Sequence, residues 1–272
     1  MMAEARDATC ETSDGSQIAF TLHRTPRAGA PRLALIHSLG LDRSVWDGVV
    51  QALKDDAELL TYDCRGHGRS ARRATTFTAE LFARDLAELL DHLDWRDAAV
   101  AGCSMGGCVA MAFAGLFQPR VTGLALIDTT AWYGLQASEQ WGARAAEARA
   151  KGLNALVDFQ VARWFGDTFR RDHPAVAART AQVFVANDFA CYAASCALLG
   201  AADLRPYLPR VRVPASIIVG EDDRATPPEM ARALHEAIPQ STLTVLPGAR
   251  HLTPLECPDR VSAELLTLLR RS

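Results

Sequence analysis

Six short apolar runs recur along the chain, each bounded by turn residues. They are too short for helices and apolar on both faces, which is typical of strands buried in a parallel sheet. The expected strands are Leu33–Ile36, Glu58–Tyr62, Ala98–Cys103, Leu124–Asp128, Ser216–Gly220 and Thr242–Leu246. Because stretches with helical periodicity separate them, the sequence predicts a doubly wound α/β sheet.

The sequence between these runs predicts the helices of the sheet. Four leucines spaced i, i+3, i+4 and i+7 form one apolar stripe within Thr78–Leu93. Gly106–Phe117 is rich in small apolar residues and predicts a fully buried helix. Thr226–Glu229 is interpreted as a capping box with proline in the first turn, and Pro258–Arg271 predicts the last helix.

A long segment without a convincing strand interrupts the alternation. Its helical pattern predicts four helices, at Ser138–Lys151, Leu153–Phe165, Pro174–Asn187 and Phe189–Leu199. A helical insertion between two sheet strands is typical of a cap over an active site, and a plain helical layer without a gating role is the alternative. The expected domains are a core of residues 1–128 and 208–272 and a helical cap of residues 129–207.

Charge and cysteine content exclude several classes of protein. Lys and Arg number 29 against 32 Asp and Glu, and the net charge of −3 without a basic stripe argues against nucleic-acid binding. No apolar run approaches the ~18 residues needed to span a bilayer, and the N-terminus lacks the apolar stretch of a secretory signal. The 7 cysteines show no disulfide-framework spacing, which favours a reduced, cytoplasmic protein without a membrane partner. Assembly into a homo-oligomer stays open.

The strongest local signal is Gly102-Cys103-Ser104-Met105-Gly106, which lies between an expected strand and an expected helix. In this context G-x-S-x-G predicts a nucleophile elbow, in which the glycines let the backbone pass closely and the helix N-terminus faces a developing oxyanion. A tight turn with a capping serine is the alternative. Ser104 is therefore the candidate nucleophile.

A nucleophilic serine needs a histidine base and an acid that orients it. Glu221, Asp222 and Asp223 follow one late strand, and the G-x-x-D spacing from Gly220 favours Asp223. His251 follows the next strand in a loop and is the candidate base, whereas His235 lies in a helical pattern.

An oxyanion hole needs two backbone donors. The N–H of Met105, directly after the serine, is the first candidate. The loop His37–Gly40 follows an early strand and supplies the second, for which we choose the N–H of Leu39. No His/Cys cluster has metal-ligand spacing and no glycine-rich loop has phosphate-binding spacing, so we expect neither a metal nor a cofactor.

These motifs, together with the Arg65-Gly66-His67-Gly68 loop and the helical insertion, resemble the α/β-hydrolase superfamily across nearly the whole chain. Within it, several stretches resemble the 3-oxoadipate enol-lactonase group. They are His37–Asp42 with Trp46-Asp47, Tyr62–Gly68, Cys103–Gly107, Arg163–Phe165, Tyr192–Cys196 followed by Asp203–Arg205, and Ala225–Pro228.

The resemblance implies an α/β-hydrolase fold, with a mostly parallel sheet flanked by helices and a helical cap. It implies the catalytic triad Ser104, Asp223 and His251, and a small-molecule ester or lactone as substrate. The implied reaction is hydrolysis of 3-oxoadipate enol-lactone in the β-ketoadipate pathway of aromatic catabolism.

The substrate contacts follow from the same resemblance. A substrate with a carboxylate needs a cation in the pocket, for which Arg163 and Arg65 are candidates, and Trp132 and Trp164 are the other expected contacts. Trp132 stands at the position where members of the group carry a basic residue, which favours the alternative of a general carboxylesterase or another lactonase.

Two further alternatives fit less well. A carbon–carbon hydrolase of ring-cleavage products is disfavoured because Leu252, not tryptophan, follows the histidine. A non-catalytic binding protein of the same fold is disfavoured because all three triad residues are present.

Overall fold

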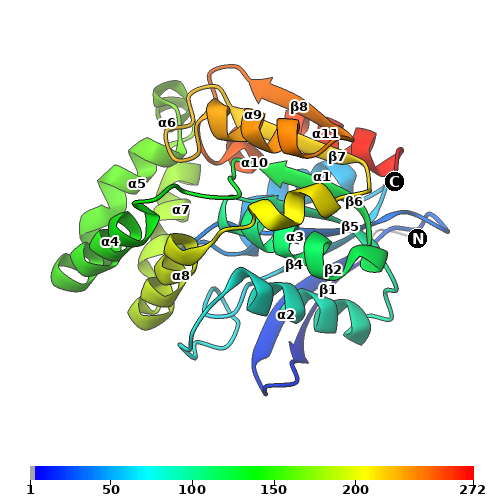
Figure 1. Ribbon diagram of the computed structural model, residues 1–272, viewed down its shortest axis with the longest axis horizontal. Coiled ribbons are helices and arrows are strands. Elements are labelled where there is room, and N and C mark those ends of the chain that lie inside the picture. Colours follow the sequence, from blue (N-terminus) through cyan, green and yellow to red (C-terminus); the bar gives the residue numbers. More distant parts are fainter. Residues whose placement is uncertain (1–3) are drawn as a thin grey trace.

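Eight strands form one sheet in residues 4–272, the part of the chain that a computed structural model describes (Figure 1). The strands are β1 Glu4–Glu11, β2 Gln17–Arg24, β3 Arg32–Ile36, β4 Glu58–Tyr62, β5 Ala98–Cys103, β6 Val121–Ile127, β7 Ala215–Gly220 and β8 Ser241–Leu246. Their order is β1-β2-β4-β3-β5-β6-β7-β8. β2 pairs antiparallel with β1 and β4, and every later neighbour is parallel, which confirms the mostly parallel sheet.

The hairpin of β1 and β2 was not expected. β1 is an edge strand with mostly exposed side chains, so no apolar run marks it in the sequence. Its pairing with β2 is closed by a turn in which the Thr12 N–H donates to Ser16 O at 2.9 Å. The other strands lie close to their expected positions, although β6 begins at Val121 and ends before Asp128, whose φ is 47°.

Helices cover both faces of the sheet. α2 Ala79–His92, α3 Met105–Leu116 and α9 Pro228–Ala237 pack on one face, and α1 Asp47–Leu53 and α11 Pro258–Leu269 pack together on the other (Figure 1). α3 is buried from its first residue to Gly115, as expected, but its last residue, Leu116, is exposed. Short helices lie between these elements: η1 Arg43–Trp46, η2 Gln118–Arg120, η4 Arg205–Arg210 and α10 Thr253–Glu256.

Residues 129–207, which we call the cap segment, connect β6 to β7 and gather at the left in Figure 1, where the arrowheads of β6 and β8 point. Their helices are α4 Ala137–Lys151, η3 Leu153–Leu156, α5 Val157–Trp164, α6 Asp167–Asp172, α7 Pro174–Val185 and α8 Phe189–Ala201. The expected helix Leu153–Phe165 is thus split into η3 and α5, and α6 was not expected.

The interpretation of Thr226–Glu229 as a capping box is wrong. α9 begins at Pro228, so the proline in its first turn is correct, but no side chain caps the helix. The Thr226 hydroxyl instead donates to Asp223 Oδ2 at 2.8 Å, because this buried carboxylate is the stronger acceptor within reach.

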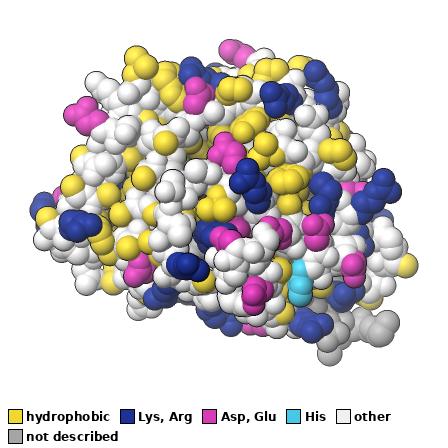
Figure 2. Space-filling view, turned by 60° about the horizontal axis from the view of Figure 1, so that its bottom comes forward, with side chains coloured by type: hydrophobic (Ala, Val, Ile, Leu, Met, Phe, Trp, Pro, Cys, Tyr) yellow, Lys and Arg dark blue, Asp and Glu magenta, His cyan; other side chains and the backbone are white. Residues whose placement is uncertain are grey.

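The face seen in Figure 2 carries acidic and basic side chains interspersed rather than a patch of one sign. Among the described helices, none alone has both the length and the apolar character to cross a membrane. The bent pair α7 and α8, which meet at 98°, meets that test only when taken together, and only on length and composition.

Candidate active site

Ser104 occupies the tight turn between β5 and α3. Its dihedral angles, φ 55° and ψ −115°, lie in the left-handed region that residues other than glycine rarely adopt. The Ser104 N–H donates to Ile127 O at 2.9 Å, and the Thr129 hydroxyl donates to Ser104 O at 2.7 Å. Backbone strain of this kind is maintained by its surroundings and occurs preferentially at functional sites.

The two glycines of the pentapeptide are required by close backbone contacts. A Cβ on Gly102 would lie 2.0 Å from Gly106 O, and a Cβ on Gly106 would lie 2.2 Å from Ile36 O. The strand–turn–helix context expected for this motif is confirmed. It presents Ser104 at the amino end of α3, where backbone N–H groups are free to bind negative charge.

The structure brings together the three side chains that the sequence singles out. His251 Nε2 lies 2.9 Å from Ser104 Oγ, and His251 Nδ1 lies 2.8 Å from Asp223 Oδ2. Because an ionised carboxylate can only accept, Nδ1 carries the ring proton and Nε2 is left to accept the serine proton. Each of the three residues is at most 5% exposed. This geometry allows a serine to act as nucleophile and a histidine as base.

Asp223 is held in its ionised form. Its Oδ1 accepts the N–H groups of Ala225 at 2.6 Å and Thr226 at 3.1 Å. Burial raises the pKa of Asp223, but the charge of His251 and the hydrogen bonds outweigh burial, so the pKa lies below its ordinary value. The carboxylate can therefore fix the orientation of the His251 ring at neutral pH.

The competing candidates lie outside this arrangement. Glu221 and Asp222 are exposed, and Glu221 accepts the Gly248 N–H at 3.0 Å. His235 is also exposed, and its Nδ1 lies 2.8 Å from Ser241 Oγ.

The two expected oxyanion donors lie beside the serine. Leu39 belongs to the loop after β3 and lines the same cavity as Ser104. Met105 is the first residue of α3, so its N–H has no acceptor within the helix.

A small cavity opens at the Ser104 hydroxyl. Its volume is about 20 Å³, which is room for about one water molecule. It is lined by Ser38, Leu39, Ser104, Tyr133, Trp141, Arg144, Gln160, Arg163, Trp164, Ala225 and His251. These side chains leave little open space beside the Ser104 hydroxyl.

The substrate contacts expected from the sequence are placed unevenly. Trp164 and Arg163 line the cavity. Trp132 does not, because its ring lies 3.9 Å from the Arg205 guanidinium, while its neighbour Tyr133 faces the cavity.

Arg65 was also a wrong candidate for a substrate contact. It is buried away from the cavity, and its Nε donates to Asp85 at 2.8 Å. A second carboxylate, that of Asp14, accepts from Arg65 Nη1 at 2.7 Å.

Two lining residues that the sequence did not reveal carry polar groups. Arg144 belongs to α4 and Gln160 to α5, so neither is near Ser104 in sequence. Gln160 is only 3% exposed, and no atom of the described chain forms a hydrogen bond with its carboxamide. Because Gln160 lines the cavity, its amide is available to a ligand.

Arg144 and Arg163 place positive charge over the cavity. Burial and the nearby charge of Arg144 lower the pKa of Arg163, although a guanidinium stays protonated. Their partners are aromatic: Arg144 lies 4.6 Å from the Trp141 ring centre, and Arg163 lies 5.8 Å from that of Phe159. No carboxylate in residues 4–272 forms an ion pair with either arginine.

Comparison with known proteins places this geometry in a family. A family model described as the alpha/beta hydrolase fold matches residues 31–258. The 3-oxoadipate enol-lactonase 2 of Acinetobacter baylyi is 30% identical over 261 residues, which cover 96% of this chain and 97% of that enzyme.

Two solved structures are similar over almost their whole length. The enol-lactonase from Burkholderia xenovorans is 34% identical with a TM-score of 0.92, covering 97% of this chain and 100% of that one. A thermophilic esterase from Thermogutta terrifontis, solved with malate bound, is 31% identical with a TM-score of 0.90, covering 97% and 98%. These similarities support hydrolase activity. The chain belongs to the α/β-hydrolase family.

Proposed function

We propose that this protein is a serine hydrolase that opens carboxylate-bearing lactones or esters, with 3-oxoadipate enol-lactone as its substrate. One observation carries the proposal. The hydrogen-bonded series Ser104–His251–Asp223 ends at a cavity where two arginines have no carboxylate partner in the described chain. The first half of this arrangement suits acyl transfer, and the second half suits an anionic substrate.

In the first step Ser104 Oγ attacks the lactone carbonyl carbon while its proton passes to His251 Nε2. The N–H groups of Leu39 and Met105 hold the oxyanion, and loss of one such donor typically lowers kcat about 10²–10³-fold. When the intermediate collapses, the ring C–O bond breaks and the enol oxygen takes the proton from His251. The enol then becomes the ketone.

In the second step a water molecule gives a proton to His251 and attacks the acyl carbon. The bond to Ser104 Oγ breaks, and the proton returns to the serine. The ionised Asp223 stabilises the imidazolium form of His251 in both steps.

The cap segment supplies the recognition half of the proposal. Arg144, Gln160 and Arg163 all belong to it. The two guanidinium groups and the amide can donate hydrogen bonds to a substrate carboxylate. The similarity to two enol-lactonases and to an esterase solved with malate, a dicarboxylate, supports the same assignment. We therefore propose that residues 129–207 act as a cap that selects the acid-bearing substrate.

The test is a paired assay on the purified protein and its Ser104→Ala variant. The substrates are 3-oxoadipate enol-lactone and a neutral short-chain aryl ester. The proposal expects a far higher kcat/KM for the lactone, and loss of both activities in Ser104→Ala. Hydrolysis of the ester alone would assign the protein as a general carboxylesterase, and activity that survives in Ser104→Ala would remove the serine from the mechanism.

A further inference from the structure

The loop that carries the second oxyanion donor is a single tight turn. The Leu41 N–H donates to Ser38 O at 3.3 Å, and Gly40 has φ 68°, which is typical of glycine at the third position of a type II turn. The Leu39 N–H lies inside this turn, so its direction depends on what holds the turn in place.

On the core side, His37 fixes the turn through hydrogen bonds. The Cys64 N–H donates to His37 Nε2 at 2.8 Å, so the ring proton is on Nδ1, which donates to Ser38 O at 2.8 Å. Burial lowers the pKa of His37 and keeps the ring in this neutral form.

The cap segment holds the same turn from the other side. Asn187, just after α7, donates from Nδ2 to Gly40 O at 2.7 Å. The same amide bonds Phe184 O at 2.9 Å and Val183 O at 3.1 Å, which anchors it to the last turn of α7. The Phe184 ring covers Gly40 so closely that a Cβ there would lie 2.9 Å from it.

These contacts continue to the substrate cavity and the base. The Trp164 ring packs edge-on against Phe184, with 5.5 Å between ring centres, and it also lines the cavity. The backbone carbonyl of Trp164 accepts the His251 N–H at 3.1 Å. The contact between Trp164 and Phe184 therefore connects the substrate cavity and His251 with the turn that carries Leu39.

We infer that Asn187 is a positioning residue for the oxyanion hole, through which the cap segment orients the Leu39 donor as well as selecting the substrate. This inference rests on the proposed function. It assigns to a cap residue a role in stabilising the transition state, which the pocket lining alone does not suggest.

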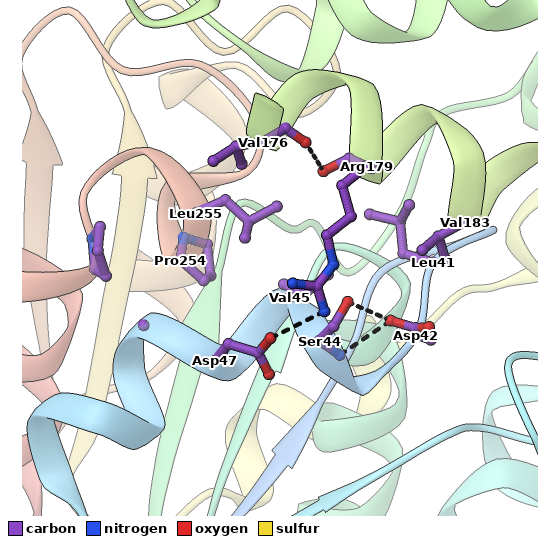
Figure 3. Close-up of a pocket in the computed structure, with 13 residues that line it drawn as sticks. Leu41, Asp42, Ser44, Val45, Asp47, Val176, Arg179, Val183, Pro254 and Leu255 are labelled. Atoms are coloured by element: carbon purple, nitrogen blue, oxygen red, sulfur yellow. Dashed lines mark hydrogen bonds and ion pairs between the residues drawn. The ribbon is translucent and has the colours of Figure 1, made fainter. Parts of the chain in front are cut away.

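A second contact of α7 with the core provides a matched control. Arg179 reaches across a cavity of about 230 Å³ to Asp47, with 3.3 Å between Nη2 and Oδ2 (Figure 3). Both side chains are about two-thirds exposed, and exposed ion pairs contribute little to stability. Removing Arg179 therefore breaks a bridge between α7 and the core without touching Gly40.

The experiment compares Asn187→Ala, the isosteric Asn187→Asp, which lacks the donor, and Arg179→Ala. We expect kcat on any ester or lactone that the protein hydrolyses to fall about tenfold to a hundredfold in both Asn187 variants, as for a misplaced catalytic group, with KM nearly unchanged. Binding of a trifluoromethyl ketone, which forms an oxyanion on Ser104, should weaken by a similar factor. Binding of malate, which forms none, should not change.

Hydrogen exchange of the peptide spanning residues 38–41 makes the test independent of the reaction. Exchange should speed up in both Asn187 variants and stay as in the wild type in Arg179→Ala. If the wild type hydrolyses nothing, the proposed function fails, and the exchange result still decides whether Asn187 orders the turn. Unchanged exchange, or a change confined to KM or shared equally by Arg179→Ala, would overturn the inference.

Discussion

The two halves of the active site differ in how fully their polar groups are paired. On the core side, His251 and Asp223 are buried and have protein hydrogen-bond partners at short distances. On the cap side, Arg144, Arg163 and Gln160 face the cavity without a polar partner from the described chain. A group that is already paired is preorganised for chemistry, whereas an unpaired group is available to a ligand. This difference supports the proposal that the paired groups carry out the chemistry and the unpaired groups bind the substrate.

The largest effect is expected at the nucleophile. Ser104→Ala should lower kcat/KM by at least about 10⁴-fold for the lactone and for a neutral ester alike, because both depend on the core half. Steady-state assays on both substrates measure it, with the melting temperature as a control for folding. A loss confined to one substrate would contradict the proposal that the same triad acts on both.

Acid should destabilise the fold through the buried His67, whose ring centre lies 5.1 Å from that of His37. Burial and the neighbouring His37 lower the pKa of His67 to about 3. The unfolded chain, in which a histidine titrates near ~6.5, therefore binds more protons between about pH 6.5 and 3. The free energy of unfolding should fall as pH falls through this window, by about 1.4 kcal/mol per pH unit from His67 alone.

Urea unfolding from pH 7 to pH 4.5 measures this slope. The His67→Gln variant, which cannot take up the proton, is the control and should show a shallower dependence. An equal slope in the two proteins would mean that other groups cause the loss.

Substitutions on the cap side should change the affinity for an acidic ligand and leave the rate of the chemical step nearly unchanged. Arg163→Ala should raise the dissociation constant for 3-oxoadipate, the product of the proposed reaction, about tenfold to a hundredfold, because a charge-assisted hydrogen bond contributes ~1.5–3 kcal/mol. Calorimetric titration measures it without any turnover. The activity on a neutral ester serves as the control, and it should stay within about threefold of the wild type.

Gln160 gives the smallest expected effect. Gln160→Leu keeps the volume but removes the amide, so kcat/KM for the lactone should fall about threefold to tenfold through loss of one neutral hydrogen bond. The same variant should melt at the temperature of the wild type, since the amide has no hydrogen bond within the described chain to lose. A lower melting temperature with unchanged kinetics would make Gln160 a structural residue.

The sequence anticipates the core half because its signals are local. Ser104 and Asp223 each follow a buried strand, and His251 follows the half-exposed edge strand β8. The carboxyl ends of these parallel strands meet at one edge of the sheet. The strained turn at Ser104 is encoded by its two neighbouring glycines. Thr226 was misassigned because its hydroxyl could serve either the helix or Asp223, and only the folded geometry decides between them.

The cap half could not be anticipated in the same way. Arg144 and Arg163 belong to separate helices, and their meeting at the cavity depends on how α4 and α5 pack. An error of one position placed Trp132 rather than Tyr133 at the cavity, because an irregular segment has no periodicity to fix which side chain faces inward. Asn187 acts through its amide on a carbonyl in another segment, and such a contact has no sequence pattern.

We propose that the Ser104–His251–Asp223 triad of the core breaks the bond and that the arginines of the cap segment select the acid. The most direct measurement is the ratio of kcat/KM for 3-oxoadipate enol-lactone to that for a neutral aryl ester, in the wild type and in the Arg144→Ala/Arg163→Ala double variant. We expect the ratio to fall at least about tenfold in the double variant while the ester activity is retained. An unchanged ratio, or an equal loss on both substrates, would contradict it.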